Sequence, residues 1–317
     1  MATASHTLLE ETANSLIYLA EEPGYDRPVV MKVLKAEHPS PERIIQFNNE
    51  FEFTSSLDIP GVRKALDSGR RDGRYVLLLE YVEGSTLRDN YVLRRRSIAD
   101  CLNIAVDIAG LLKNIHEAGI IHKDINPKNI LVNHETGEAF LIDFGISARI
   151  SLKTRHLGNP DRLEGSLAYI SPEQTGRMNR QIDHRSDLYS LGVTLYELFS
   201  GQLPFDAKDS MELVHAHIAR VPVPLFELNP GIPRTLSDIV MRLMSKNAED
   251  RYQSAYGLRE DLQRCMLQWV HTGAIQPFEL GESDFSGKFQ IPQKFYGREK
   301  ETAALMEAFE RVAAGSL

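Results

Sequence analysis

The sequence predicts an α+β protein with two lobes, a small strand-rich lobe at residues 7–81 and a larger helical lobe at residues 83–270. Two observations support this fold class. Short runs of alternating or β-branched apolar residues, which are typical of strands, dominate the first range. In the second range, apolar residues recur at the spacing of three and four positions that buries one face of a helix.

Each element of the small lobe has a local pattern. Residues 7–20 alternate and then become apolar, a Pro-Gly pair stands at 23–24, and residues 29–34 are apolar again. We interpret these segments as two strands and a hairpin. The sequence Pro-Ser-Pro-Glu at 39–42 predicts the start of a helix, and the apolar run at 75–81 predicts a buried strand.

In the helical lobe, residues that are typical of helix ends and turns mark the predicted elements. Ser97 is suited to cap the first turn of a helix that Gly119 would end. Two short apolar runs flank residues 135–137 and predict a hairpin. Further helices are predicted at residues 188–200, 209–219, 235–245 and 254–270.

The bulk composition favours a soluble, cytoplasmic protein. The net charge of −8 gives no overall positive field that would attract nucleic acid or an anionic membrane. Cys101 and Cys265 match no metal-ligand spacing and no disulfide framework. No stretch reaches the roughly 20 apolar residues that span a bilayer. We therefore expect neither nucleic-acid nor membrane partners.

The most informative feature is the sequence His-Lys-Asp-Ile-Asn-Pro-Lys-Asn at 122–129, followed 14 positions later by Asp-Phe-Gly at 143–145. Asp124 could orient a hydroxyl group and take its proton. Asn129 and Asp143 offer the oxygen ligands that Mg²⁺ prefers beside phosphates. Each residue alone could equally be a solvated loop residue or a turn cap. Their order across an apparent hairpin favours a nucleotide-dependent phosphotransferase.

At these motifs the chain resembles the eukaryotic-like (Hanks-type) Ser/Thr protein kinases, over about residues 7–270. The resemblance implies a two-lobed kinase fold and the use of ATP with Mg²⁺. It also implies that Asp124 is the catalytic aspartate and that Asn129 and Asp143 bind the metal.

The resemblance further assigns Lys32 to the α- and β-phosphates of ATP and Glu50, 18 residues later, to the positioning of this lysine. From the residues alone, Lys32 could instead face solvent on its strand. Glu52 is a rival for Glu50, although it would lie on a different face of the helix.

The sequence Leu-Glu-Tyr-Val at 79–82 resembles the hinge between kinase lobes. The resemblance implies that the backbone of Glu80 and Val82 holds adenine, with Leu79 at the back of the pocket. A buried strand end is the alternative.

Three further motifs make the resemblance specific. The segment from Gly165 to Glu173 resembles the end of an activation segment. Asp187 resembles the aspartate that braces the catalytic loop. Arg251 resembles the arginine that forms a two-point ion pair with Glu173.

The expected glycine-rich loop over the phosphates is missing. Glu10, Thr12 and Ser15 stand at its glycine positions. Glycines let backbone N–H groups approach phosphates closely. We therefore expect Thr12 and Ser15 to contact nucleotide in a weaker or differently shaped site.

The catalytic loop also departs from the family pattern. Asn126 replaces a lysine that assists the transferred phosphoryl group. As a catalytic residue its amide can donate a hydrogen bond but brings no positive charge, which Lys128 could supply instead. Lys123 replaces an arginine that grips activation-loop phosphate, and lysine cannot reproduce that fork. Basic residues at 149–162 and 177–185 could meet an acidic substrate or form an ordinary solvated face.

The end of the chain has a different character. Residues 271–294 contain Gly, Pro and Ser with weak periodicity, which predicts a linker. Residues 295–317 resemble the start of an AAA-type ATPase domain, cut before its phosphate loop. This resemblance implies the N-terminal part of a bacterial multidomain signalling protein, with downstream ATPase and sensor modules as partners. A helix packing on the kinase is the alternative.

Three functions remain open. The favoured one is a Ser/Thr protein kinase that phosphorylates protein substrates with Mg-ATP. A pseudokinase that binds nucleotide or partners would explain the missing glycines and Asn126. A small-molecule phosphotransferase shares the catalytic loop pattern, but Glu173, Asp187 and Arg251 disfavour it because they build a peptide-docking surface.

Overall fold

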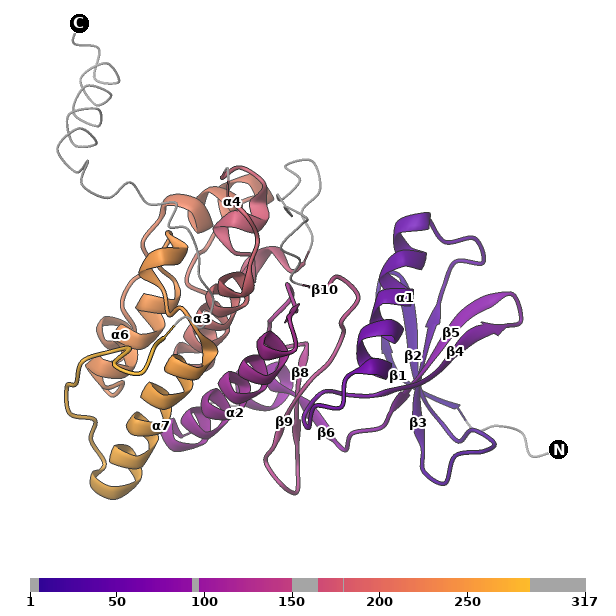
Figure 1. The fold of residues 1–317 in the computed structure, drawn as a ribbon, viewed down its shortest axis with the longest axis horizontal. Coiled ribbons are helices and arrows are strands. Elements are labelled where there is room, and N and C mark those ends of the chain that lie inside the picture. Colours follow the sequence, from indigo (N-terminus) through magenta and orange to yellow (C-terminus); the bar gives the residue numbers. More distant parts are fainter. Residues whose placement is uncertain (1–5, 93–96, 150–164, 179, 286–317) are drawn as a thin grey trace, which may run out of the picture. The chain divides into compact units, whose positions relative to one another are not determined.

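The computed structural model describes residues 6–92, 97–149, 165–178 and 180–285 (Figure 1). The chain divides into two units, Met1–Phe285 and Ser286–Leu317. The first unit contains both predicted lobes, and the α+β fold class is confirmed. The predicted start of an ATPase domain, residues 295–317, lies outside the described residues.

The small lobe is a five-stranded antiparallel sheet in the order β1-β2-β3-β5-β4, with helix α1 packed against it (Figure 1). Both faces of the central strands are apolar, and each face forms its own small core. The elements are β1 His6–Glu11, β2 Ser15–Ala20, β3 Val29–Leu34, α1 Pro41–Ser56, β4 Ala65–Arg71 and β5 Arg74–Glu80.

Two interpretations of this lobe need correction. Residues 7–20 form two strands rather than one, because the hydroxyl of Thr12 accepts a hydrogen bond from the N–H of Ser15 at 2.9 Å and closes a tight turn. The sequence also does not predict β4. Six of its seven side chains are exposed, so the strand lacks the apolar pattern that would reveal it.

Helix α1 begins where the sequence predicts. Ser40 caps it by accepting a hydrogen bond from the N–H of Arg43, and Pro41 occupies the first turn. Phe47 and Phe53 are buried on the inner face of the helix, and Glu50 lies on that same buried face.

The helical lobe surrounds one large apolar core, and α3 runs through its interior. Thirteen of the 17 residues of α3 are buried, including Asp187. Ser97 caps α2 in a capping box with Asp100, and α2 ends just before Gly119, as predicted. The helices are α2 Ile98–Glu117, α3 His184–Ser200, α4 Ser210–Ala219, α5 Leu225–Leu228, α6 Arg234–Leu243 and α7 Ala255–Thr272.

Two small sheets carry the loops of the site. Strand β8 starts directly after Asn129, and its partner β9 ends two residues before Asp143, so the predicted hairpin brings these residues together. The strands are β6 Gly84–Thr86, β7 Ile120–Ile121, β8 Ile130–Asn133, β9 Ala139–Leu141 and β10 Ala148–Arg149. Single π- or 3₁₀-turns occur at Arg88–Val92, Leu167–Tyr169, Pro172–Thr175 and Ala248–Asp250.

The segment that follows α7 packs on the helical lobe, which differs from the predicted linker at 271–294. Ile275 is only 9% exposed and joins the main core. The carboxylate of Asp284 accepts hydrogen bonds from the N–H groups of Gln253 and Ser254 at 2.7 and 2.9 Å. The folded unit therefore extends to Phe285.

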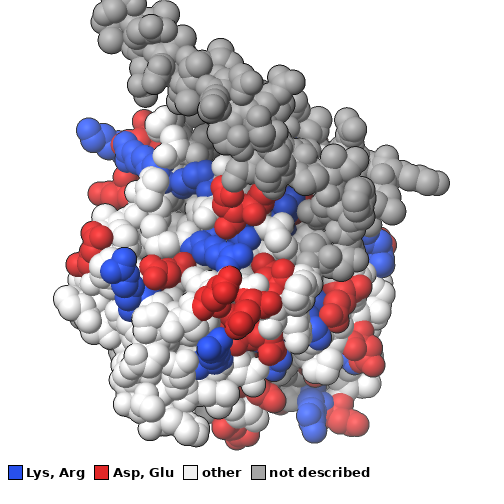
Figure 2. Space-filling view, turned by 60° about the vertical axis from the view of Figure 1, so that its left-hand side comes forward, with Lys and Arg blue, Asp and Glu red and all other residues white. Residues whose placement is uncertain are grey.

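Charges of both signs are interspersed on the face shown in Figure 2, so its coloured residues form no continuous basic surface. Within the described residues, no helix combines the length and apolar character needed to cross a bilayer. Both cysteines are buried free thiols, and burial raises the pKa of Cys265 to about 12.

Candidate active site

Strand β3 and helix α1 bring Lys32 and Glu50 together, as predicted. The Lys32 Nζ lies 2.5 Å from Glu50 Oε2 and 3.7 Å from Asp143 Oδ2. The Glu50 side chain is 2% exposed, whereas Glu52 faces solvent, so Glu50 is the partner of the lysine. A strand, a helix and a loop thus meet at one ammonium group.

The pKa shifts of this cluster follow from burial and charge. Burial disfavours the Lys32 ammonium, but Asp143 and Glu50 outweigh it and raise the pKa of Lys32. In turn Lys32 lowers the pKa of Asp143. Burial raises the pKa of Glu50, and the repulsion from Asp143 adds to this effect. At neutral pH, Lys32 is therefore charged and Asp143 is ionised.

Asp143 is held in an unusual backbone conformation. Its φ angle is +63°, in the left-handed region, and its Oδ1 accepts a hydrogen bond from the N–H of Gly145 at 3.3 Å. The ring of the next residue, Phe144, is buried against His122 with a centroid separation of 4.6 Å. Phe144 is buried in the core, whereas the side chain of Asp143 is 45% exposed.

The carboxylate of Asp124 is fixed through both oxygens. Its Oδ1 accepts the N–H of Ser166 at 2.8 Å, and its Oδ2 accepts the amide nitrogen of Asn129 at 2.9 Å. The backbone N–H of Ile142 also donates to the carbonyl of Asn129 at 3.0 Å, which ties the catalytic loop to the segment that carries Asp143.

Between Asp124 and Asn129, one predicted site residue is buried and another is exposed. Asn126 is 2% exposed, and its amide nitrogen donates to the carbonyl of Asp124 and to Ser166 Oγ. These contacts support a positioning role, and its predicted catalytic role remains a prediction. Lys128 is exposed. Its predicted contact with phosphate is likewise untested by the geometry.

A buried carboxylate braces the catalytic loop from below. Asp187 of α3 accepts the N–H groups of His122 and Lys123 at 2.9 and 2.7 Å, and it pairs with His116. Lys123 has a φ of +69°, so these bonds hold a backbone conformation that non-glycine residues rarely adopt. The hydrogen bond and charge of His116 outweigh burial and lower the pKa of Asp187.

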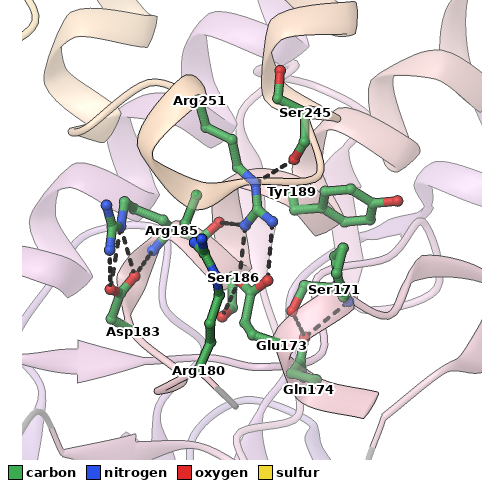
Figure 3. Close-up of polar contacts among 12 residues, drawn as sticks. Ser171, Glu173, Gln174, Arg180, Asp183, Arg185, Ser186, Tyr189, Ser245 and Arg251 are labelled. Atoms are coloured by element: carbon green, nitrogen blue, oxygen red, sulfur yellow. Dashed lines mark hydrogen bonds and ion pairs between the residues drawn. The ribbon is translucent and has the colours of Figure 1, made fainter. Parts of the chain in front are cut away.

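Figure 3 shows the predicted pair of Glu173 and Arg251, which is completely buried. Two parallel hydrogen bonds of 2.8 and 2.9 Å join the guanidinium to the carboxylate, and Ser186 adds a third bond to Glu173 at 2.7 Å. Despite burial, these partners lower the pKa of Glu173. The loop that carries Glu173 is therefore held to α3 and to the turn that precedes α7.

Two of the three arginines at 177–185 serve internal contacts, whereas Arg177 is exposed. Arg180 pairs with Glu249 at 2.5 Å, and Arg185 forms a fork with Asp183 (Figure 3). They are thus not free to meet an acidic substrate, as one reading of the sequence proposed. Residues 150–164 of the same basic cluster lie outside the described residues.

The predicted hinge follows β5. Leu79 is 1% exposed, and the N–H of Glu80 donates to the carbonyl of Lys64 at 2.9 Å. Within the described residues, the backbone N–H and carbonyl of Val82 make no hydrogen bond. These two groups are available to a flat heterocycle such as adenine.

The turn between β1 and β2 uses its polar groups internally. The Thr12 hydroxyl accepts the N–H groups of Asn14 and Ser15 and donates to the carbonyl of Ser15. The N–H of Ser15 is therefore not open to a phosphate. The predicted nucleotide contacts of Thr12 and Ser15 remain predictions that this closed turn does not support.

Sequence reasoning missed two contributors to the site. The backbone of Ser166 holds Asp124, and no side-chain pattern could reveal this. The buried guanidinium of Arg63 lies with its Nη2 3.9 Å from Glu50 Oε1. Arg63 stands beside Lys64 in the sequence Val-Arg-Lys-Ala, and nothing in that pattern distinguishes the buried arginine from the exposed lysine.

Comparison with known proteins identifies the family. Residues 9–262 match the model of the protein kinase domain. The chain belongs to the protein kinase domain family.

Named relatives of this kinase domain agree. It is 34% identical over 258 residues to a probable serine/threonine-protein kinase of Clostridium perfringens, covering 80% of this chain and 37% of that protein. It is 32% identical to the serine/threonine-protein kinase PrkC of Bacillus subtilis, covering 78% of this chain and 38% of that one. It is also 30% identical to hybrid signal transduction histidine kinase G of Dictyostelium discoideum, covering 68% of this chain and 9% of that protein. The chain thus spans less than half the length of these relatives.

Proposed function

We propose that this chain is a Ser/Thr protein kinase domain that transfers the γ-phosphoryl group of ATP to hydroxyl groups of proteins. The observation that carries the proposal is the meeting of Lys32, Glu50 and Asp143 within 3.7 Å of the lysine nitrogen. The names of the bacterial relatives support the Ser/Thr specificity.

The oxygen groups present fit Mg²⁺. Asp143 is ionised and partly exposed, and the amide nitrogen of Asn129 is committed to Asp124, which leaves its Oδ1 as an acceptor. Two protein ligands are typical where phosphates complete the coordination. When bound, the ion would neutralise charge on the phosphates. Within the described residues no group of three His, Cys, Asp or Glu could form a separate metal centre.

Asp124 is the proposed base. In the transfer, the acceptor oxygen forms a bond to the γ-phosphorus while the bond to the β,γ-bridging oxygen breaks and ADP leaves. Asp124 would orient the hydroxyl group and take its proton. Since both of its oxygens are already held by Ser166 and Asn129, the carboxylate needs no reorientation when substrate arrives.

Lys128 is the cation that we propose for the moving phosphoryl group, because Asn126 is buried and uncharged. Lys128→Ala should lower turnover by about tenfold, since one electrostatic contact to the transition state is lost. Unchanged turnover of this variant contradicts the role.

A nucleotide-binding module with little turnover is the second candidate, and the closed turn at Thr12 is the observation that favours it. A small-molecule phosphotransferase finds less support, because the buried pair of Glu173 and Arg251 stabilises a loop on the substrate side.

The decisive experiment follows labelled phosphate. The chain is incubated with γ-labelled ATP, Mg²⁺ and a mixture of proteins, beside Asp124→Asn and a surface control, Asp238→Asn. We expect label on protein with the wild type and the control, and at least about a thousandfold less with Asp124→Asn. Tight nucleotide binding without transfer supports the second candidate, and label confined to a small molecule contradicts the kinase.

We also propose that the chain begins a longer cytoplasmic signalling protein, in which residues 295–317 start an AAA-type ATPase domain. The hybrid signal transduction histidine kinase of Dictyostelium, of which the chain matches 9%, supports the presence of such a domain in a long signalling protein. Sequencing of the complete transcript tests this proposal. A reading frame without a phosphate loop soon after residue 317 contradicts it.

A further inference from the structure

Arg63 adds a second cation to the cluster of Lys32, Glu50 and Asp143. Its side chain is 10% exposed, and its Nη2 lies 3.9 Å from Glu50 Oε1. Burial lowers the pKa of Arg63, and Glu50, Asp143 and Glu80 partly offset this effect. An arginine remains charged in such surroundings. The cluster therefore contains two largely buried cations where the kinase pattern assigns only Lys32.

The loop before β4 fixes Arg63 in this place. The N–H of Leu141 donates to the carbonyl of Gly61 at 2.7 Å, and the N–H of Arg63 donates to the carbonyl of Leu141 at 3.2 Å. Gly61 has a φ of +82°, and a Cβ there would lie 2.3 Å from the side chain of Leu111. Only glycine allows this close docking. The backbone of Arg63 is thus joined to a strand that ends two residues before Asp143.

The two oxygens of Glu50 are used unequally. Oε2 bonds to Lys32 at 2.5 Å, whereas Oε1 is buried without a hydrogen-bond partner in the described residues. A buried carboxylate with one unsatisfied oxygen is costly unless a cation stands near it. Arg63 is the group that faces this oxygen.

We propose that Arg63 is a positioning residue that compensates the second oxygen of Glu50, so that Lys32 can turn toward nucleotide phosphates without leaving Glu50 unpaired. The inference rests on the proposed kinase function, because it assigns the phosphates to Lys32. It adds a third member to the lysine–glutamate pair and links α1 to the loop that precedes β4.

The effect of removing Arg63 should depend on pH. The charged groups that face Glu50 are Lys32 from β3, Asp143 after β9 and Arg63. Asp143 raises the pKa of Glu50, and the two cations lower it. Removal of Arg63 raises the pKa of Glu50 further, so a larger fraction of Glu50 is protonated as the pH falls. The loss of ATP affinity caused by removing Arg63 should therefore become larger as the pH falls.

The test compares Arg63→Met with Arg63→Lys and with Arg43→Met, an exposed arginine on α1. We expect Arg63→Met to raise the KM for ATP about tenfold at pH 6 and less at pH 8, since a buried charge has lost its partner. Arg63→Lys should recover most of the loss, and Arg43→Met should match the wild type. A wild-type KM and pH profile in Arg63→Met overturns the inference.

Two controls keep the outcome interpretable. Arg63→Gln retains polarity and serves if Arg63→Met does not fold, with the same pH trend expected. The ¹³C carboxyl resonance of Glu50 reports on the pairing without nucleotide, and its titration midpoint should rise in either variant. An unmoved midpoint contradicts the role of Arg63, whereas a wild type that fails to bind Mg-ATP contradicts the proposed function alone.

Discussion

Lys32–Glu50 and Arg251–Glu173 are both buried ion pairs, but their hydrogen bonds are satisfied to different degrees. Arg251 uses all five of its N–H groups in the contacts of the locked loop. Glu50 has an oxygen without a hydrogen-bond partner, and its lysine is shared with Asp143. The pKa of Glu173 is lowered, while that of Glu50 is raised. The pair whose hydrogen bonds are all satisfied holds a loop in place. The pair with an unsatisfied carboxylate oxygen can still interact with a ligand.

The largest effect on stability is expected for Arg251→Met. The variant leaves Glu173 buried without its cation, and we expect it to lose about 3–5 kcal/mol of unfolding free energy. Urea unfolding followed by the fluorescence of Trp269, the single tryptophan, measures the loss. Arg220→Met, which breaks an exposed pair with Glu212, should cost less than about 1 kcal/mol. Equal losses in the two variants would remove the distinction.

Lys32→Met should separate activity from stability. We expect kcat/KM for ATP to fall about a hundredfold, because a charge aimed at the phosphates disappears. The unfolding free energy should change by less than about 1 kcal/mol, because Glu50 can take up a proton instead of remaining an unpaired charge. Lys35→Met, three positions along the chain on the exposed pair with Glu11, is the matched control. A large loss of stability in Lys32→Met would contradict this reading.

The contributions of Glu173 and Glu50 to stability should change with pH in opposite directions. The pKa of Glu173 is lowered from 4.5, so its stabilisation is present above that value and is lost as the pH falls through the lowered pKa. The pKa of Glu50 is raised from 4.5, so relative to Glu50→Gln the wild type loses stability as the pH rises toward that raised pKa. Each slope is at most about 1.4 kcal/mol per pH unit. Denaturation of Glu173→Gln and Glu50→Gln across pH 3–7 tests both, and slopes of equal sign would refute the comparison.

The smallest effect is expected for the turn between β1 and β2. Thr12→Gly removes the hydroxyl that occupies the N–H of Ser15, and glycine lets the backbone approach a phosphate. We expect the KM for ATP to fall two- to fivefold, less than one full charge contact would give. Thr7→Gly on β1 controls for the loss of a strand side chain. A raised KM in Thr12→Gly would show that the closed turn itself favours the nucleotide.

Two of the candidate site's contacts were predictable because their geometry is local. Asn129 and Asp143 flank one hairpin, so a short sequence pattern suffices to bring them together. Glu50 follows from the periodicity of a single helix that Ser40 caps. The first pair depends on one hairpin, and the buried position of Glu50 depends on one helix, although its contact with Lys32 joins that helix to β3.

The parts that escaped prediction depend on contacts between distant residues. Arg63 reaches the site only because its loop docks on Leu141, and no pattern around Arg63 encodes that pairing. Strand β4 is recognised by its partner β5 rather than by its own exposed residues. The end of the folded unit was placed too early because Asp284 acts on α7 through a single side chain.

The contacts of Asp284 have a practical consequence for expression of this kinase domain. The family match ends at residue 262, and the helical pattern ends near residue 270. A recombinant protein trimmed at either point would lose the carboxylate that binds the N–H groups of Gln253 and Ser254 just before α7, and it would expose the surface that Ile275 covers. Fragments should therefore be cloned to residue 285 or beyond, and we expect a lower melting temperature for any shorter version.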